Sequence, residues 1–200
     1  QGTTQENVQA SSLDLFAGAV QLPSSGTDSI ELIALVKNAQ NVLMEGIDVV
    51  FSADADAALM ITQGTTGADG QATATLTTQN NRQNRDIQIT ATSGTLSQTL
   101  SISVVGTTVN IDGPSSVILN DPVDLTLSLL DSDGNGIANQ QVNLSAANGL
   151  LSSTTPTTGT NGQVTVTYTG NTAGVDTISA SALNDESEFT VTVQADDFSF

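Results

Sequence analysis

One unit of sequence occurs twice in this chain of 200 residues. The segment IELIALVKNAQNVLMEGIDVVFSA, which begins at Ile30, aligns without a gap on VDLTLSLLDSDGNGIANQQVNLSA, which begins at Val123. Further along, GADGQATATLT from Gly67 matches GTNGQVTVTYT from Gly159, and LSISV then matches FTVTV. Because an internal repeat determines the architecture, we expect both copies to fold as the same structural unit.

Apolar and polar residues alternate within each matched block, as at Leu125, Leu127 and Leu129. A period of two is typical of a β-strand with one face in the core. Turn signals such as Asn161-Gly162 separate the blocks, and their density is that of an antiparallel sandwich, with about seven short strands per copy. No segment has the pattern of a long helix. The sequence therefore predicts an all-β protein made of two tandem antiparallel β-sandwiches.

The repeat also predicts the domain boundaries. We expect an N-terminal extension at residues 1–11, a first domain at 12–105, a second domain at 106–194, and the start of a following repeat or a tail at 195–200. The connection VVGTTV is too short to act as a flexible linker. Phe198 and Phe200 align on Val109 and Ile111, which open the second domain, so we expect the native chain to continue with a further repeat.

Composition narrows the classes of function. The chain has no Cys and no His, and its only basic residues are Lys37, Arg82 and Arg85. Most side chains that serve as nucleophile, general base or metal ligand are therefore missing, and we expect no enzyme and no catalytic residue. A formal net charge of −18 disfavours binding to nucleic acid and to anionic lipid. No apolar run is long enough to span a bilayer, so we expect no direct membrane insertion of this segment.

Family-level motifs follow the same blocks. The second copy contains LLDSDGNGIANQQVNLSA, TNGQVTVTYT and ISASA, and the first contains VVFSADADAALM and ADGQATATLT, with KNAQNVL in place of the acidic turn. On these blocks the chain resembles the bacterial immunoglobulin-like domains of the invasin and intimin adhesins, the Big-1 group. The resemblance covers nearly the whole chain and identifies both copies as immunoglobulin-like sandwiches.

The resemblance implies a location and a role. Such domains stand on the bacterial cell surface, here attached to the outer membrane through regions outside this segment, as the stalk or spacer of an adhesin. Their partners would be neighbouring Ig-like repeats in the same chain, with a host or surface receptor bound through another domain. Two alternatives stay open: an extracellular module that binds carbohydrate or protein, and an accessory domain pair of a secreted enzyme. The absence of Trp counts against sugar stacking.

The stretch DSDGNG, residues 131–136, resembles the start of a calcium loop. Asp131, Asp133 and Asn135 stand at its first, third and fifth positions, as in an EF-hand. The twelfth position, which should supply a bidentate acid, is Val142, and the first copy has no acid at the three matching positions. We therefore interpret the stretch as a hairpin turn without metal or cofactor, and keep a weak calcium site at Asp131, Asp133 and Asn135 as the alternative.

Other acidic residues are weaker candidates. Asp54 and Asp56 lie two apart, so they would share the solvent face of a strand or could chelate a cation from a loop. A further set lies near the expected domain ends, where a cation could bind: Asp112, Asp185, Glu186, Glu188, Asp196 and Asp197. No repeated ligand pattern accompanies them, so we favour solvated side chains.

Two further features concern single residues. Tyr168, the only Tyr, aligns with Leu76 of the first copy, so we expect it in the core. Arg82 and Arg85 lie in TQNNRQNRDI, which is longer than its counterpart in the second copy. We expect this stretch to form a solvated turn or a protruding loop.

Overall fold

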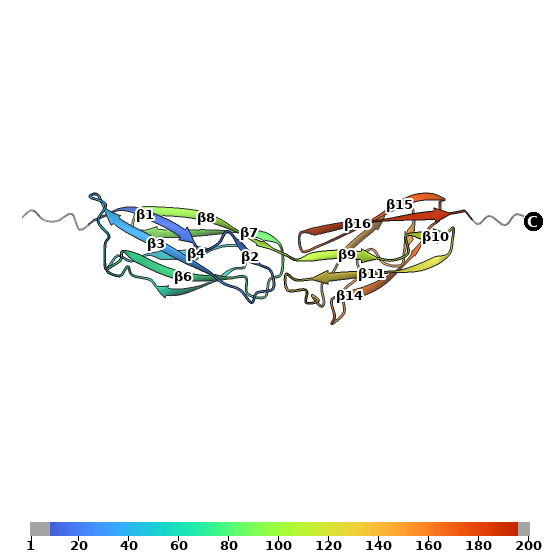
Figure 1. Ribbon diagram of the computed structural model, residues 1–200, viewed down its shortest axis with the longest axis horizontal. Helices are drawn as coiled ribbons and strands as arrows, with labels where there is room; N and C mark the ends of the chain where they lie inside the picture. The colour runs from blue at the N-terminus through green and yellow to red at the C-terminus, as the bar shows by residue number, and fades with distance from the viewer. Residues whose placement is uncertain (1–8, 196–200) are drawn as a thin grey trace, which may run out of the picture. The chain divides into compact units, whose positions relative to one another are not determined.

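The computed structural model describes residues 9–195, in which every regular element is a β-strand. The chain divides into two compact units, and Figure 1 shows the strands of each. The first unit contains the described residues up to Asn81 together with Arg85–Val105, and the second contains Arg82–Asn84 together with the described residues from Gly106. The predicted Phe198 and Phe200 of a following repeat, and most of the predicted N-terminal extension, lie outside the described residues.

The first unit consists of two four-stranded sheets. One has the order β1-β3-β6-β5, formed by Ala10–Ala17, Ile30–Asn38, Gln71–Thr77 and Ala58–Gln63. The other has the order β2-β8-β7-β4, formed by Gln21–Pro23, Leu96–Val105, Arg85–Ser93 and Val50–Ala53. All pairs are antiparallel except β2 with β8, which is parallel.

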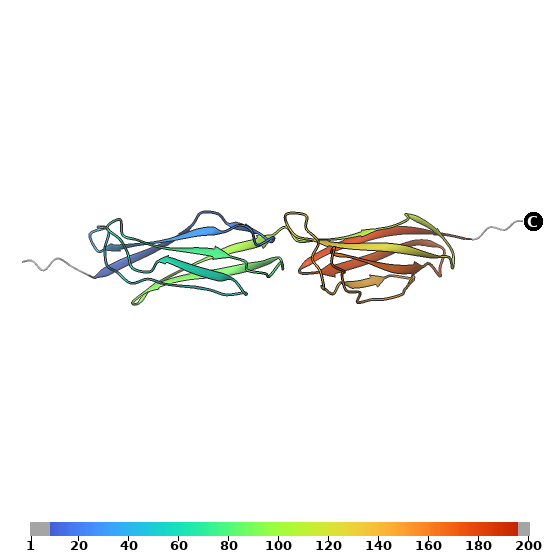
Figure 2. The ribbon, with the colours of Figure 1, turned by 90° about the horizontal axis from the view of Figure 1, so that it is seen from below.

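The second unit repeats this arrangement. One sheet has the order β9-β11-β14-β13, formed by Thr108–Asp112, Pro122–Leu130, Gln163–Thr169 and Leu150–Leu151. The other has the order β10-β16-β15-β12, formed by Ser116–Ile118, Asp185–Gln194, Gly174–Ala182 and Asn143–Ala146. The β10–β16 pair is parallel, as β2–β8 is in the first unit. Figure 2 shows the strands of each unit from below.

Strand pairing follows the sequence repeat residue by residue. Ile30 in β3 lies opposite Leu76 in β6, and Val123 in β11 lies opposite Tyr168 in β14. These are the positions that the alignment of the two copies pairs. The prediction of an all-β fold with two immunoglobulin-like sandwiches is confirmed.

Each unit has one strand more than the sequence predicted. The additional strands are β2 and β10, which have three residues each. β2 follows β1 in the chain but pairs with β8, the last strand of the first unit, in the opposite sheet. In the same way, β10 follows β9 but pairs with β16, the last strand of the second unit. Leu22 in β2 and Val117 in β10 are buried by this switch. After each of these strands one more backbone bond continues the pairing, from the Ser24 N–H to the Val105 carbonyl and from the Leu119 N–H to the Gln194 carbonyl.

The alternating pattern places one face of each strand in a core. In the first unit the core lies between the sheets and includes Leu32, Leu76, Ile87 and Ile102, all fully buried. Burial of side chains of this size stabilises the folded unit by roughly 1.5–3 kcal/mol each. The second unit has its own core, formed mainly by Val and Leu together with Tyr168.

The stretch around Arg82 and Arg85 differs from the expectation of a solvated or protruding loop. Residues 81–85 are half-buried, and Arg85 is the first residue of β7. Its guanidinium donates from Nε to the Ala55 carbonyl at 2.6 Å and from Nη1 to the Asn81 carbonyl at 3.1 Å. Arg85 therefore fastens two loops of the first unit, because a planar fork of five donors can serve several carbonyls at once.

Candidate functional site

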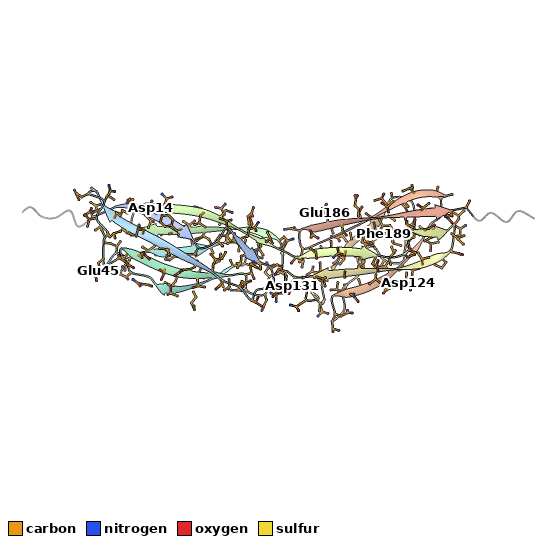
Figure 3. All side chains as sticks on the ribbon, in the orientation of Figure 1. Asp14, Glu45, Asp124, Asp131, Glu186 and Phe189 are labelled. Atoms are coloured by element: carbon orange, nitrogen blue, oxygen red, sulfur yellow. The ribbon has the colours of Figure 1, made fainter. Side chains whose placement is uncertain are left out.

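The DSDGNG turn follows β11 and is held by the Asp131 side chain, which Figure 3 labels. Asp131 Oδ1 accepts the backbone N–H of Asp133 at 2.9 Å and that of Asn135 at 3.0 Å. The Asp131 N–H donates to the Asn135 carbonyl at 2.9 Å, and the Gly134 N–H donates to the Asp131 carbonyl at 3.0 Å. Gly134 has φ of +79°, a conformation that glycine adopts without steric cost. The loop thus closes through its own hydrogen bonds.

The first copy builds the same turn with an uncharged residue. Asn38, which aligns with Asp131, accepts the N–H groups of Gln40 and Val42 on Oδ1, both at 3.0 Å. Asn41 has φ of +62° and donates its N–H to the Asn38 carbonyl, as Gly134 does in the second copy. An amide oxygen can therefore accept the two backbone N–H groups of this turn in place of a carboxylate oxygen. This supports the hairpin interpretation.

The second oxygen of Asp131 faces a cation of the same unit. Asp131 Oδ2 lies 3.7 Å from Arg82 Nε, and the Asp131 side chain is only 5% exposed. Asp133 and Asn135 are exposed, while Val142 is fully buried. Within residues 9–195, no group of three or more His, Cys, Asp or Glu side chains is placed to hold a metal ion. The hairpin interpretation and the weak calcium alternative at Asp131, Asp133 and Asn135 both stay predictions.

The other acidic candidates are dispersed. Asp54 lies in the loop after β4, where its Oδ1 accepts the Gln88 N–H at 2.7 Å. Asp56 is in the same loop with φ of +55°, so the two do not share a strand face. Asp185 accepts the Val109 N–H on Oδ2 at 2.8 Å. A cation near the domain ends stays a prediction, and two of its suggested ligands, Asp196 and Asp197, lie outside the described residues.

Tyr168 lies in the core, as predicted, but its hydroxyl has a partner that the sequence analysis did not single out. It donates to Asp176 Oδ2 at 2.7 Å, and both side chains are buried. The same carboxylate accepts the N–H groups of Asn148, Gly149 and Thr177 at 2.7–2.9 Å. A single buried charge therefore connects β14 and β15 to the loop after β12, with each oxygen satisfied twice.

The pKa values of this pair are shifted in opposite directions. Burial alone would raise the pKa of the Asp176 carboxyl, but the hydrogen bonds from Tyr168 and from the three backbone N–H groups outweigh it and hold the pKa below its ordinary value. Burial, the hydrogen bond to Asp176 and the charge of that carboxylate raise the pKa of the Tyr168 hydroxyl. Asp176 is therefore a buried carboxylate that stays ionised because its environment is rich in donors.

The sequence contained a signal for this carboxylate. Asp176 stands two and four residues before Ile178 and Ala180, which are inward-facing apolar positions of β15. An acid in register with core residues is expected to be buried with hydrogen-bond partners. Its match in the first copy is Ile87, so the comparison of copies would also have marked it.

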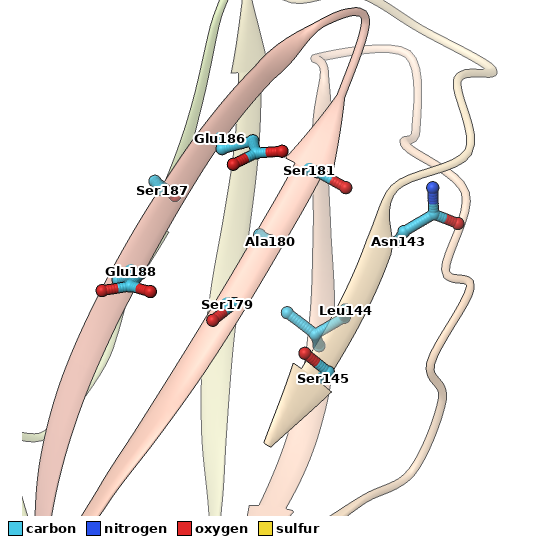
Figure 4. A pocket seen from close by; sticks show the side chains of 9 residues that line it. All are labelled: Asn143, Leu144, Ser145, Ser179, Ala180, Ser181, Glu186, Ser187 and Glu188. Carbon is cyan, nitrogen blue, oxygen red and sulfur yellow. The ribbon is translucent and has the colours of Figure 1, made fainter. Parts of the chain in front are cut away.

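The second unit has a shallow groove of about 260 Å³ over β12, β15 and β16. Figure 4 shows its lining side chains. Ser181 lies between Asn143 and Glu186, and Ser179 lies between Ser145 and Glu188, so the groove consists of two polar rows across three strands. Its lining includes no aromatic and no basic side chain.

The groove offers hydroxyl, amide and carboxylate oxygens. That donor set can accept hydrogen bonds from a polar or cationic group. It lacks the apolar enclosure that small-molecule sites normally have. The described residues also include no helix that is long and apolar enough to cross a membrane.

Comparison with known proteins adds the family. The model of the bacterial Ig-like domain (group 1) matches residues 12–105 and 120–196. The chain is 26% identical over 186 residues to the inverse autotransporter adhesin YeeJ of Escherichia coli (strain K12), covering 86% of this chain and 8% of the adhesin. The solved structure of the Yersinia pseudotuberculosis adhesin InvE is 18% identical, with a TM-score of 0.59, over 96% of this chain and 62% of that one.

These matches agree with the fold. The InvE likeness concerns the fold alone, and the chain spans only a small part of the length of the E. coli adhesin. One matched segment lies in each sandwich, the second beginning after β10, and together the two segments cover most of the chain. The chain therefore belongs to the bacterial Ig-like domain family, group 1, in two tandem copies.

Proposed function

We propose that these two domains are a non-catalytic spacer segment of a bacterial cell-surface adhesin, attached to the outer membrane through other parts of the parent protein. The observation that carries the proposal is the strand-for-strand duplication, in which each copy closes its own core. A module that is complete in itself can be added in series without altering its neighbours. Similarity to an adhesin of which this chain matches 8% supports a place within a long array.

Surface chemistry supports a passive role. All three basic side chains are engaged within the units, Lys37 with Asp14 at 3.6 Å, Arg82 with Asp131, and Arg85 with loop carbonyls. The only Tyr is fully buried, and the chain has no Trp. Interfaces draw much of their binding energy from exposed Trp, Tyr and Arg, so this surface is poorly equipped for tight recognition.

The proposed partners follow from this role. Neighbouring Ig-like repeats of the same chain would adjoin the segment, and a host or surface receptor would be bound through another domain. The strong negative charge disfavours nucleic acid and anionic lipid. It also keeps a crowded surface protein soluble through repulsion between copies.

The test uses the parent protein displayed on cells. One strain lacks residues 12–194, a second carries two unrelated domains of the same family in their place, and both are compared with the unaltered strain at equal surface expression. We expect the substituted strain to keep adhesion to host cells, whereas the deleted strain brings an epitope at the tip closer to the membrane. Loss of adhesion in the substituted strain would contradict a spacer role.

The groove over β12, β15 and β16 favours one alternative, an extracellular binding module. Under that alternative the purified 200-residue chain would bind a glycan or protein array, and Glu186→Ala with Glu188→Ala would abolish the signal. The matched control is the pair Asp54→Ala with Asp56→Ala, which removes two acids from a loop of the first unit. Binding lost only with the groove variant would replace the spacer proposal.

A further inference from the structure

Three Asn-Gly dipeptides occur in the second copy, at Asn135-Gly136, Asn148-Gly149 and Asn161-Gly162. Asn-Gly is the dipeptide most open to spontaneous deamidation, because the backbone nitrogen of the glycine can attack the side-chain amide and no Cβ hinders it. The reaction requires that nitrogen to be available and the Asn side chain to move. The structure treats the three dipeptides very differently.

Asn148-Gly149 is held by the buried carboxylate of Asp176. The Gly149 N–H donates to Asp176 Oδ2 at 2.7 Å, and the Asn148 N–H donates to Oδ1 at 2.9 Å. A Cβ at Gly149 would lie 2.2 Å from the Tyr168 ring, so this backbone is packed tightly against the core. The nitrogen that would attack is therefore bound to a charged acceptor.

Asn161-Gly162 is held by a second set of contacts. The Gly162 N–H donates to the Gly159 carbonyl at 2.9 Å. The Asn161 side chain is engaged at both ends, since Oδ1 accepts the Gln163 N–H and Nδ2 donates to Gln163 Oε1, both at 3.1 Å. Neither the nucleophile nor the side-chain amide is free to approach the other.

Asn135-Gly136 lacks these hydrogen bonds, although its backbone is packed as closely as that of Gly149, since a Cβ at Gly136 would lie 2.0 Å from the Asn161 carbonyl oxygen. The Asn135 backbone bonds to Asp131, but within the described part of the chain neither the Asn135 side chain nor the Gly136 N–H has a hydrogen-bond partner. Both residues are exposed. Gly136 lies opposite Leu130 at a position whose ladder bonds fall on the flanking residues, which explains why its N–H is unused.

We propose that Asn135 is the site at which this protein is modified by spontaneous deamidation. The Gly136 nitrogen attacks Cγ of Asn135 and loses its proton, an N–Cγ bond forms, the Cγ–Nδ2 bond breaks, and Nδ2 leaves as ammonia. Water then adds to either carbonyl carbon of the resulting succinimide ring and opens it to aspartate or isoaspartate. The sum is one amide and one water converted to one carboxylic acid and one ammonia, without oxidant or reductant.

The product changes the turn. A new carboxylate appears beside Asp131 and Asp133 on a chain whose formal net charge is already −18. In the isoaspartyl form the backbone gains a methylene between Asn135 and Gly136, which displaces the Asn135 carbonyl from the Asp131 N–H. The modification would therefore accumulate with the age of the protein and loosen this hairpin together with the close packing of Gly136 against Asn161-Gly162.

The test is peptide mapping of the 200-residue chain after incubation in mildly alkaline buffer at physiological temperature. Digestion with pepsin suits a chain with three basic residues, and its acidic conditions stop further deamidation. Water labelled with ¹⁸O marks conversions that occurred during incubation. We expect Asn135 to convert at least about ten times faster than Asn148 or Asn161, because their attacking nitrogens must first lose a hydrogen bond.

A parallel incubation in urea separates the fold from the local sequence. If the contacts cause the difference, the three rates should converge once the chain is unfolded. Asn135→Gln serves as the matched control, since its longer side chain must close a larger and slower-forming ring. Equal or faster conversion at Asn148 or Asn161 in the folded chain would overturn the proposal, and so would an unchanged ratio of rates in urea.

Discussion

Replacing Tyr168 by Phe tests whether the buried Tyr168–Asp176 pair stabilises the second unit. The substitution keeps the ring in the core and removes only the hydroxyl, which donates to Asp176 Oδ2 at 2.7 Å. No cavity of consequence is left, so the cost is that of one hydrogen bond to a buried charge. Such bonds contribute about 1.5–3 kcal/mol to the free energy of unfolding.

That loss should be visible in the melting of the second unit. For a domain of this size, the lower end of the range corresponds to a decrease in Tm of about 6 °C. Calorimetry gives the size of the effect, and hydrogen exchange followed by mass spectrometry gives its place. We expect faster exchange at the Asn148 and Gly149 amides, which share the carboxylate, and unchanged exchange in the first unit.

A double-mutant cycle with Asp176→Asn isolates the pair. If the two side chains stabilise the unit through each other, the effect of Tyr168→Phe should be much smaller in the Asp176→Asn background. The matched control is Leu76→Met in the first unit, a volume-conserving change at the equivalent position with no polar partner. The reasoning would be refuted if Tyr168→Phe changed the free energy of unfolding of the second unit by less than about 0.5 kcal/mol, or if the first unit lost stability instead.

Four further outcomes are expected. Leu127→Asp places a charge in the second core at a cost of several kcal/mol, so in limited proteolysis the second unit should be digested while the first is largely spared. Unfolding of both units at one midpoint would indicate a single fused domain. Calorimetry with calcium should detect no binding tighter than about millimolar, and a micromolar site that disappears in Asp133→Ala would contradict the hairpin interpretation. Asp131→Asn should lower Tm less than Asp131→Ala, because only the amide keeps an acceptor for the turn N–H groups, as Asn38 does. In acid titration followed by hydrogen exchange, the second unit should lose stability before the first, since the folded-state pKa of Asp176 is lowered and its contribution disappears as pH falls through that value.

Strand positions could be predicted well because the two copies repeat the same period. Alternation fixes which face of a strand is buried, so Leu125, Leu127 and Leu129 could be assigned to the core from the sequence alone, and all three are fully buried. The turn at Asp131 could be interpreted in the same way, since its match Asn38 showed that no carboxylate was needed to form a hairpin. In both cases the second copy of the repeat provided an independent observation with which to check the interpretation of the first.

Short and long-range features could not be predicted in this way. The strands β2 and β10 have three residues each, which is too few to show alternation. Their parallel partners, β8 and β16, are the last strands of each unit in sequence and therefore lie far from them along the chain. Arg85 looked like part of a polar loop because its partners are backbone carbonyls, which leave no mark in the sequence. Backbone partners are the usual ones for buried polar side chains, so this limit is general.

The same loop is secured in the two copies by opposite chemistry. In the first unit, the guanidinium at the start of β7 donates to the Ala55 carbonyl in the loop after β4, and the acid of that loop, Asp54, is exposed and, among the described residues, accepts only the Gln88 N–H. In the second unit, a carboxylate in β15 accepts the N–H groups of Asn148 and Gly149 in the loop after β12. Arg85 and Asp176 do not align, and one donates where the other accepts, so comparison of the copies conceals their common role. Guanidinium keeps its proton throughout the accessible pH range, whereas a carboxylate is neutralised in acid. Two units with one fold should therefore respond differently to acid, and the unit that depends on Asp176 should open first.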